Sequence, residues 1–211
     1  MSAHLPDDYN TRPLRPVDIQ VLLKSAPFQW WISGGWALDL FLGKETRPHF
    51  DIDVSIARQD QLTAQSFLRQ WEFWSTMRLE SGEIFLPHWE KGEFLGKEIP
   101  GCWARETPGA PWRFEFLMQE IDDRTWTFRY ADVVQHGVDA IGAFTAENIP
   151  YLQPEIVLLT KALRRREVDE QDFLRVLPKL NRAQCEQLLN DIQKIQPDHA
   201  WLAVIKGLLS S

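Results

Sequence analysis

Two stretches of the chain alternate between apolar and polar residues, which is typical of a strand that buries one face. In residues 50–56, FDIDVSI, the apolar side chains share one face, and Asp51 and Asp53 lie on the other. In residues 112–118, WRFEFLM, Glu115 lies on the less apolar face. We therefore predict two strands that each present a carboxylate on the face opposite the core.

The N-terminal part predicts two short helices around a strand. A helix is expected over residues 17–26, and the apolar run FQWWIS over 28–33 predicts a strand. The pair Gly34-Gly35 follows and indicates a tight turn. A second helix over residues 36–43 is expected to end at Gly43, because glycine suits the position after a helix.

The remaining chain divides into a mixed part and a helical part. Residues 59–74 predict an amphipathic helix, and 75–110 predict strands joined by loops. The run QEIDDRT predicts a hairpin into the strand WTFRY. Further helices are expected from Pro154, over 169–177 and 183–195, and from His199. The predicted fold class is α/β (α+β): a small mixed sheet flanked by helices in residues 1–148, then a helical domain over 149–211, with the active site in the cleft between them.

Composition narrows the class of protein. The 211 residues are 44% hydrophobic and 12% aromatic, which excludes pervasive disorder. No run approaches the ~20 apolar residues of a membrane span, and the N-terminus lacks the pattern of a secretory signal. Cys102 and Cys185 lack metal-ligand spacing, so a disulfide framework or a zinc site is not expected and a cytoplasmic location fits.

Charge and tryptophan content bear on the partner. With 23 basic and 30 acidic residues the net charge is −7, which disfavours nucleic acid and would attract a cationic small molecule, although solubility alone also explains it. The 10 tryptophans are explained by core packing or by a groove for a ring-shaped ligand. A monomer and a homodimer both stay open.

The strongest chemical signal is the pair Asp51 and Asp53. Two carboxylates on one strand face repel each other, and a divalent cation such as Mg²⁺ removes that cost. The alternative is an edge strand whose acids face water. Ser33, Gly34 and Gly35 precede a predicted helix, where backbone N–H groups can bind a phosphate, although an ordinary turn explains them too.

Here the chain resembles a known family. The run SGGWALDLFLGKETRPHFDIDVSI resembles the nucleotidyltransferase superfamily, which shares the DNA polymerase β-like fold, and most closely its aminoglycoside 2''-adenylyltransferase group. The segment IPYLQPEIVLLTKALRRREVDEQDFLRVLPKL resembles the C-terminal helical element of that group. Residues 58–110 show no such likeness. Phe50 and Glu115 depart from the usual pattern, since relatives often have a polar residue and Asp there.

The resemblance implies a role for each matching residue. Asp51, Asp53 and Glu115 would bind magnesium, with two ions expected, or, for Glu115, accept the proton of the acceptor. Ser33, Gly34, Gly35 and Lys161 would bind the triphosphate of ATP or another NTP. Arg47, His49, Asp169 and Asp172 match accessory positions. The implied reaction moves AMP from ATP onto a hydroxyl of a small molecule, such as an aminoglycoside-type antibiotic, and releases pyrophosphate.

Alternative interpretations remain for several of these residues. His49 fits a structural hydrogen bond as well as a phosphate contact, and Arg164, Arg165 and Arg166 fit a solvated helix end. The acidic stretch 80–106 fits either a wall for a polycation or loop surface. Two other functions also stay open, namely nucleotidyl transfer to a protein or RNA, and a non-catalytic nucleotide-binding module.

Overall fold

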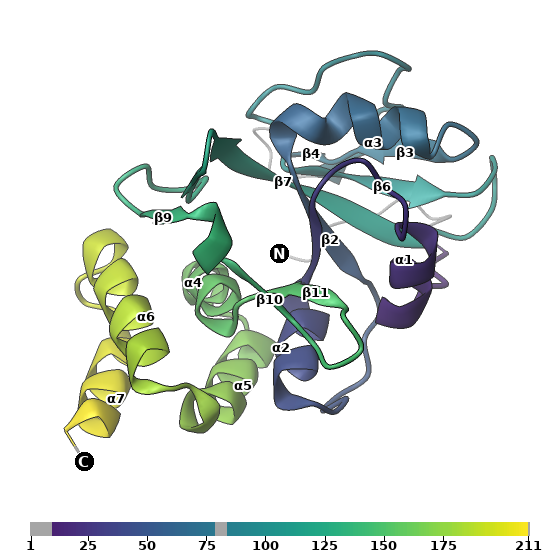
Figure 1. Cartoon of the computed structure of the whole chain (residues 1–211). Coiled ribbons are helices and arrows are strands. Elements are labelled where there is room, and N and C mark those ends of the chain that lie inside the picture. Colours follow the sequence, from purple (N-terminus) through teal and green to yellow (C-terminus); the bar gives the residue numbers. More distant parts are fainter. Residues whose placement is uncertain (1–9, 79–83, 211) are drawn as a thin grey trace. The chain divides into compact units, whose positions relative to one another are not determined.

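The computed structural model describes residues 10–78 and 84–210, and Figure 1 labels its elements. The described residues form two compact units, the first from 10–32, 48–78 and 84–120, the second from 33–47 and 121–210. The chain therefore passes between the units after Ile32, after Arg47 and after Glu120. The predicted domain boundary after residue 148 stays a prediction. In the structure the strands from residue 125 onward group with the helices of the second unit.

The first unit is built on a mixed sheet, as the sequence predicted. Its strands run in the order β1 (Trp30–Ser33), β2 (Asp53–Ala57), β7 (Phe114–Asp122), β6 (Gly101–Arg105) and β3 (Glu72–Ser75). The strands β2 and β7 pair in parallel, whereas β6 pairs antiparallel with β7 and with β3. The strand β2 therefore lies inside the sheet, with a neighbour on each side.

Alternation correctly identified the buried faces of both strands, with two differences in β2. Along β7 buried residues such as Phe114 and Phe116 alternate with half-buried ones such as Glu115. The strand β2 begins at Asp53 and not at residue 50, and Phe50 is 81% exposed. Ser55 is fully buried, because β2 is an inner strand and Gln119 Nε2 donates a hydrogen bond of 3.0 Å to its hydroxyl.

The helices of the first unit are α1 (Pro16–Leu22) and α3 (Gln61–Phe67). The predicted helix over 59–74 was too long, because β3 begins at Glu72 and its burial alternates with a period of two. Residues 75–110 contain β4 (Met77–Arg78), β5 (Ile84–Phe85) and β6, joined by loops. Glu80 and Glu83 of this stretch lie outside the described residues.

The second unit combines helices with two hairpins. It begins with α2 (Gly34–Leu42), which ends at Gly43 in the left-handed conformation, as predicted. The hairpins are β8 (Thr125–Thr127) with β9 (Gln135–Gly137), and β10 (Gly142–Phe144) with β11 (Pro150–Leu152). Four helices follow, close to the predicted ranges: α4 (Pro154–Arg164), α5 (Glu167–Val176), α6 (Arg182–Ile195) and α7 (Ala200–Leu209).

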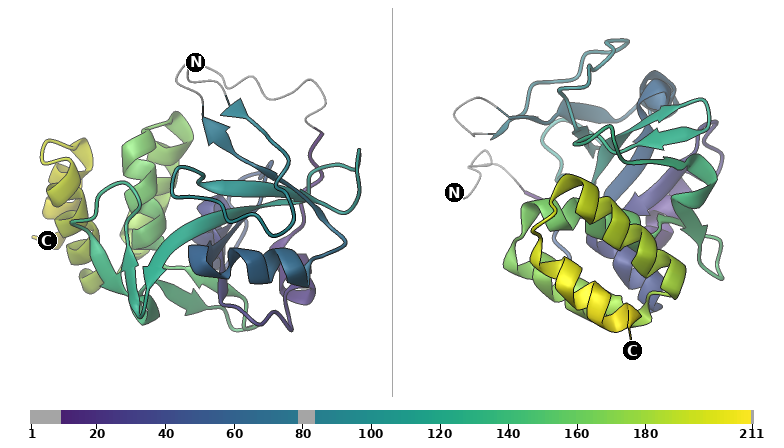
Figure 2. Two further views of the ribbon diagram at one scale, coloured as in Figure 1. Left: turned by 90° about the horizontal axis from the view of Figure 1, so that it is seen from above. Right: turned by 90° about the vertical axis from the view of Figure 1, so that its left-hand side faces the viewer.

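Packing among these helices sets the geometry of the second unit. The helix α4 packs against α5 and α6, α6 packs against α7, and α2 packs against α4 and α5, as Figure 2 lets the reader follow. Buried residues such as Leu158, Phe173 and Leu188 form this core. The helices α2, α4 and α5 are therefore held together, and they carry the charged residues described below.

Candidate active site

Strand register brings two of the predicted catalytic acids together. In the parallel pair of β2 and β7, Asp53 lies directly opposite Glu115. Neighbouring strands are about 4.8 Å apart, and directly opposite residues point to the same face of a sheet. Both side chains are half-buried. Asp51 precedes β2 and is exposed, so strand pairing does not fix its position.

Glu115 is surrounded by Thr76, Ile52 and Gly101 from other segments of the chain, which together form what we call its seat. The hydroxyl of Thr76 donates a hydrogen bond of 2.9 Å to Glu115 Oε1, and the amide of Glu115 donates one of 3.0 Å to the carbonyl of Ile52. On the neighbouring strand a Cβ at Gly101 would lie 3.3 Å from Oε1 and 2.2 Å from the carbonyl oxygen of Phe116. Only glycine lets β6 approach this closely, and the Thr76 hydroxyl fixes the orientation of the Glu115 carboxylate.

A buried cysteine lies close to the carboxylate pair. Cys102 is fully buried on β6, and burial raises the pKa of its thiol well above the ordinary value. The negative charge of Glu115 raises this pKa further. Cys102 is therefore a protonated thiol at neutral pH.

The glycine turn differs from the prediction in where the helix starts. The helix α2 begins at Gly34, which has a φ of 61°, and Ser33 is the residue before its first turn. Ser33 is 3% exposed, and within residues 10–78 and 84–210 its hydroxyl has no hydrogen-bond partner. The first N–H groups of a helix also lack acceptors within the helix. A buried hydroxyl beside such N–H groups suits an anionic oxygen.

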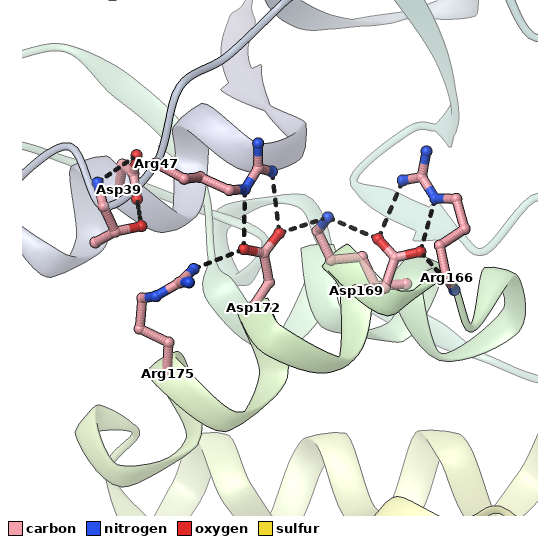
Figure 3. Close-up of polar contacts among 8 residues, drawn as sticks. Asp39, Arg47, Arg166, Asp169, Asp172 and Arg175 are labelled. Carbon is pink, nitrogen blue, oxygen red and sulfur yellow. Dashed lines mark hydrogen bonds and ion pairs between the residues drawn. The ribbon is translucent and has the colours of Figure 1, made fainter.

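Lys161 lies in a buried cluster of charges, which Figure 3 shows. Its Nζ is 2.9 Å from Asp169 Oδ1 and 2.9 Å from Asp172 Oδ2, and the residue is 6% exposed. Arg47 donates from Nε and from Nη2 to the two oxygens of Asp172, at 3.1 Å each. The remaining contacts come from α5 and the residue before it: Arg175 to Asp172 and Arg166 to Asp169.

These cations keep both aspartates ionised. Burial alone would raise the pKa of each carboxyl, but hydrogen bonds and nearby positive charge outweigh it. Arg166 and Lys161 lower the pKa of Asp169 to about 2. Arg47 and Lys161 hold the pKa of Asp172 below its ordinary value. The cluster therefore keeps its ion pairs throughout the neutral pH range.

The sequence pattern did not indicate three residues that make contacts in these regions, namely Thr76, Gly101 and Asp39. Thr76 and Gly101 lie next to Glu115 but come from other segments of the chain. Asp39 is 4% exposed on α2, and it accepts hydrogen bonds from the amide of Thr46 at 3.0 Å and from its hydroxyl at 2.5 Å. These two hydrogen bonds connect Thr46, the residue before Arg47, back to α2.

The other candidate residues are more exposed. His49 is half-buried, and the arginines that end or follow α4 are exposed. In the acidic stretch Glu90, Glu93 and Glu98 are exposed, whereas Glu106 pairs with Arg113 at 2.9 Å. In the described part of the chain, no three His, Cys, Asp or Glu side chains form a group that could hold a metal ion. Nor is any helix there long and apolar enough to cross a membrane.

Comparisons with known proteins agree with the predicted family and fold. The model of the aminoglycoside-2''-adenylyltransferase family matches residues 17–85. The crystal structure of the lincosamide antibiotic adenylyltransferase LnuA with lincomycin bound is 16% identical, with a TM-score of 0.50 over 79% of this chain and 97% of that one. The family match confirms the predicted resemblance over residues 30–57, and it extends to residue 85, into a stretch for which the sequence analysis found no likeness. The structural likeness confirms the nucleotidyltransferase fold.

Two more distant structures were also found. ANT(2")-Ia in complex with adenylyl-2"-tobramycin is 13% identical, with a TM-score of 0.46 over 91% of this chain and 92% of that one. An antigenic nucleotidyltransferase-like protein from Paracoccidioides brasiliensis is 16% identical, with a TM-score of 0.46 over 92% and 94%. No curated protein sequence gave a significant match.

Proposed function

We propose that this nucleotidyltransferase moves AMP from ATP onto a hydroxyl group of a small antibiotic-like molecule and releases pyrophosphate, with magnesium as the metal. The single observation that carries the proposal is the parallel register that sets Asp53 opposite Glu115. Two like charges on one sheet face destabilise the fold, so their placement together suits a site that receives a cation. The match of residues 17–85 supports the adenylyl group as the one transferred.

The carboxylates fit magnesium by their chemistry. Mg²⁺ prefers hard oxygen ligands and is commonly held by one or two carboxylates together with substrate phosphates and water. Asp53 is placed by β2, and the exposed Asp51 adds a second carboxylate two positions earlier. When bound, the ion neutralises charge on the triphosphate and polarises the α-phosphate.

The start of α2 fits the triphosphate. The buried hydroxyl of Ser33 has no partner in the described residues, and leaving such a group unsatisfied costs about 1–3 kcal/mol. An anionic phosphate oxygen satisfies this hydroxyl together with the first N–H groups of the helix. The left-handed Gly34 leaves no Cβ to block the approach.

These placements support an adenylyl transfer. The acceptor hydroxyl oxygen forms a bond to the α-phosphorus, and the bond between the α- and β-phosphates breaks, so pyrophosphate leaves. Glu115 accepts the proton of the hydroxyl, because Thr76 orients its carboxylate on the sheet face that it shares with Asp53. Asp51 and Asp53 would hold the metal. Lys161 supports the second unit through Asp169 and Asp172 instead of binding phosphate.

The acceptor is proposed from the neighbours and from charge. LnuA was crystallised with lincomycin, and ANT(2")-Ia with adenylyl-2"-tobramycin. A net charge of −7 attracts a cationic acceptor. Hydroxylated aminoglycosides are therefore the first class to test, and lincosamides the second.

The test measures pyrophosphate release from ATP, GTP, CTP and UTP, each with Mg²⁺ and a panel of aminoglycosides and lincosamides. We expect release with ATP and at least one acceptor, whose mass increases by one adenylyl group. The variant Glu115→Gln should lose about 100-fold or more in kcat, because a positioned base contributes that much. Glu98→Gln is the matched control, since Glu98 is an exposed glutamate of the same unit.

Two results would contradict this function. Full transfer by Glu115→Gln would remove Glu115 from the chemistry. A labelled protein or RNA after incubation of the enzyme with labelled ATP and a lysate, without transfer to any antibiotic, would show that the acceptor is a macromolecule.

A further inference from the structure

The segment that leads into β2 is held by hydrogen bonds at Thr46 and Arg47. Arg47 is the last residue of the second unit before the chain passes into the first, and Asp51 follows it by four positions. Two aspartates hold the end of this segment from inside the second unit. Asp39 on α2 accepts two hydrogen bonds from Thr46, and Asp172 on α5 accepts two from Arg47 (Figure 3).

The contact between Arg47 and Asp172 has the geometry of a clamp. Nε and Nη2 of Arg47 each donate to a different oxygen of Asp172, so the planar guanidinium meets the planar carboxylate along two parallel bonds. The side chain of Asp172 is 4% exposed and that of Arg47 is 23% exposed. Such a two-bond contact fixes orientation as well as distance, which a single ammonium group does not do.

Charge balance does not explain why Arg47 is in the cluster. Asp169 and Asp172 already receive Lys161, Arg166 and Arg175, which all come from α4, α5 or the residue before α5. These three positive charges already exceed the two negative charges, so the cluster does not need Arg47 for neutrality. What Arg47 adds is a connection between the α4–α5 pair and the segment that leads to the catalytic acids.

We propose that Arg47 is a positioning residue, which acts through its clamp on Asp172 to fix the segment that carries Asp51 and Asp53. The inference rests on the proposed function of those two acids. A chain spans at most ~3.6 Å per residue, so an anchor at Arg47 confines Asp51 to a short tether. Loss of the anchor releases Asp51, which strand pairing does not hold, more than Asp53, which β2 holds.

The experiment compares Arg47→Ala with Arg175→Ala. The two arginines are a matched pair, because both donate to Asp172 Oδ1, at 3.1 Å and 2.9 Å, and each variant removes one positive charge from the same carboxylate. Only Arg47 belongs to the segment that leads to Asp51. Arg47→Lys serves as a third variant, which keeps the charge but loses the two-bond geometry.

Three readouts are measured on the full chain: kcat and KM for ATP with an accepted antibiotic, the Mg²⁺ concentration for half-maximal rate, and amide hydrogen exchange of residues 44–55 without ligands. For Arg47→Ala we expect kcat to fall about 10- to 100-fold, because small displacements of reacting groups cost that much. The half-maximal Mg²⁺ concentration should rise about 10-fold, as for other residues that orient metal ligands. Exchange in residues 44–55 should become faster, and Arg47→Lys should fall between the wild type and Arg47→Ala.

Arg175→Ala should leave kcat and the exchange of residues 44–55 within about twofold of the wild type. Equal effects of Arg47→Ala and Arg175→Ala on kcat and exchange would overturn the proposal, because both would then act through cluster stability alone. Failure of the proposed function is distinguishable. If the wild type transfers no nucleotide, the exchange measurement still decides whether Arg47 fixes the segment. Should Arg47→Ala fail to fold, Arg47→Lys gives the same comparison.

Discussion

The molecule holds two groups of carboxylates in opposite surroundings. In the first unit Asp53 lies opposite Glu115 on neighbouring strands, half-buried, and Glu115 accepts a hydrogen bond from the neutral hydroxyl of Thr76. In the second unit Asp169 and Asp172 are almost fully buried, and each is contacted by at least two cationic side chains.

This difference separates a stabilising role from a chemical one. A buried carboxylate that is paired with several cations keeps one geometry and one charge state, which suits a structural support. Two carboxylates side by side on a half-buried surface cost stability, and the cost falls when a cation and phosphates bind. Acidic residues of the same type are thus expected to respond in opposite ways to substitution in the two units.

Asp53→Asn gives the largest expected effect on activity. The amide keeps the size of the side chain but removes a charged metal ligand, so kcat for nucleotidyl transfer should fall by about 10³-fold. Because the substitution also removes repulsion with Glu115, the free energy of unfolding should stay within about 1 kcal/mol of the wild type or rise. The measurements are pyrophosphate release and urea unfolding followed by circular dichroism. A fall of about 3 kcal/mol in the free energy of unfolding would contradict the difference between the two groups of carboxylates, because that is the size expected for disrupting the buried ion cluster.

Lys161→Met is expected to show the reverse pattern. It removes the buried cation that bridges Asp169 and Asp172 and leaves their charge partly uncompensated, so the free energy of unfolding should fall by about 3 kcal/mol. The folded fraction should keep its KM for ATP. Arg182→Ala is the control, because the exposed pair of Arg182 with Glu186 should contribute less than about 1 kcal/mol. A variant of normal stability whose KM for ATP rises 10-fold would return Lys161 to the phosphate-binding role that the resemblance implied.

The sequence predicted the elements of the site better than its contacts. The alternation in residues 50–56 and 112–118 identified the strands and the faces of Asp53 and Glu115, because a period of two is a local property of the chain. It left open whether the strands are neighbours, since pairing between segments so distant in sequence depends on the whole fold. The register of β2 with β7 supplied that missing fact.

Errors in the prediction also have physical causes. The run around residues 59–74 contains enough apolar residues for a helix, but α3 ends at Phe67 and residues 72–75 form β3, in which Phe73 and Ser75 are buried on one face. The seat of Glu115 could not be predicted, since Thr76 and Gly101 contribute through three-dimensional proximity and carry no motif. The role of Lys161 in the ion cluster depends likewise on the packing of α4 against α5.

Acid should weaken the second unit through Asp169. Its pKa is about 2 in the folded protein, below the ordinary value of 3.8, so the unfolded chain binds more protons between these values. The stabilisation is fully present above about pH 4 and is lost as pH falls towards 2, with a total of about 2 kcal/mol. Urea unfolding at pH 7, 4 and 2.5 measures it. Asp169→Asn should flatten this dependence, whereas Asp198→Asn, at an exposed site, should leave it unchanged.

Thr76→Val gives the smallest expected effect and tests the seat of Glu115 directly. Valine keeps the shape of threonine but cannot donate to Glu115 Oε1, so the carboxylate loses a hydrogen bond worth about 1–2 kcal/mol. The kcat should fall about 10-fold, because Glu115 loses the donor that orients its carboxylate. Thr76→Ser keeps the hydroxyl and should retain the rate. If valine and serine lower kcat equally, packing of the threonine methyl group matters at this position, and the hydroxyl does not orient Glu115.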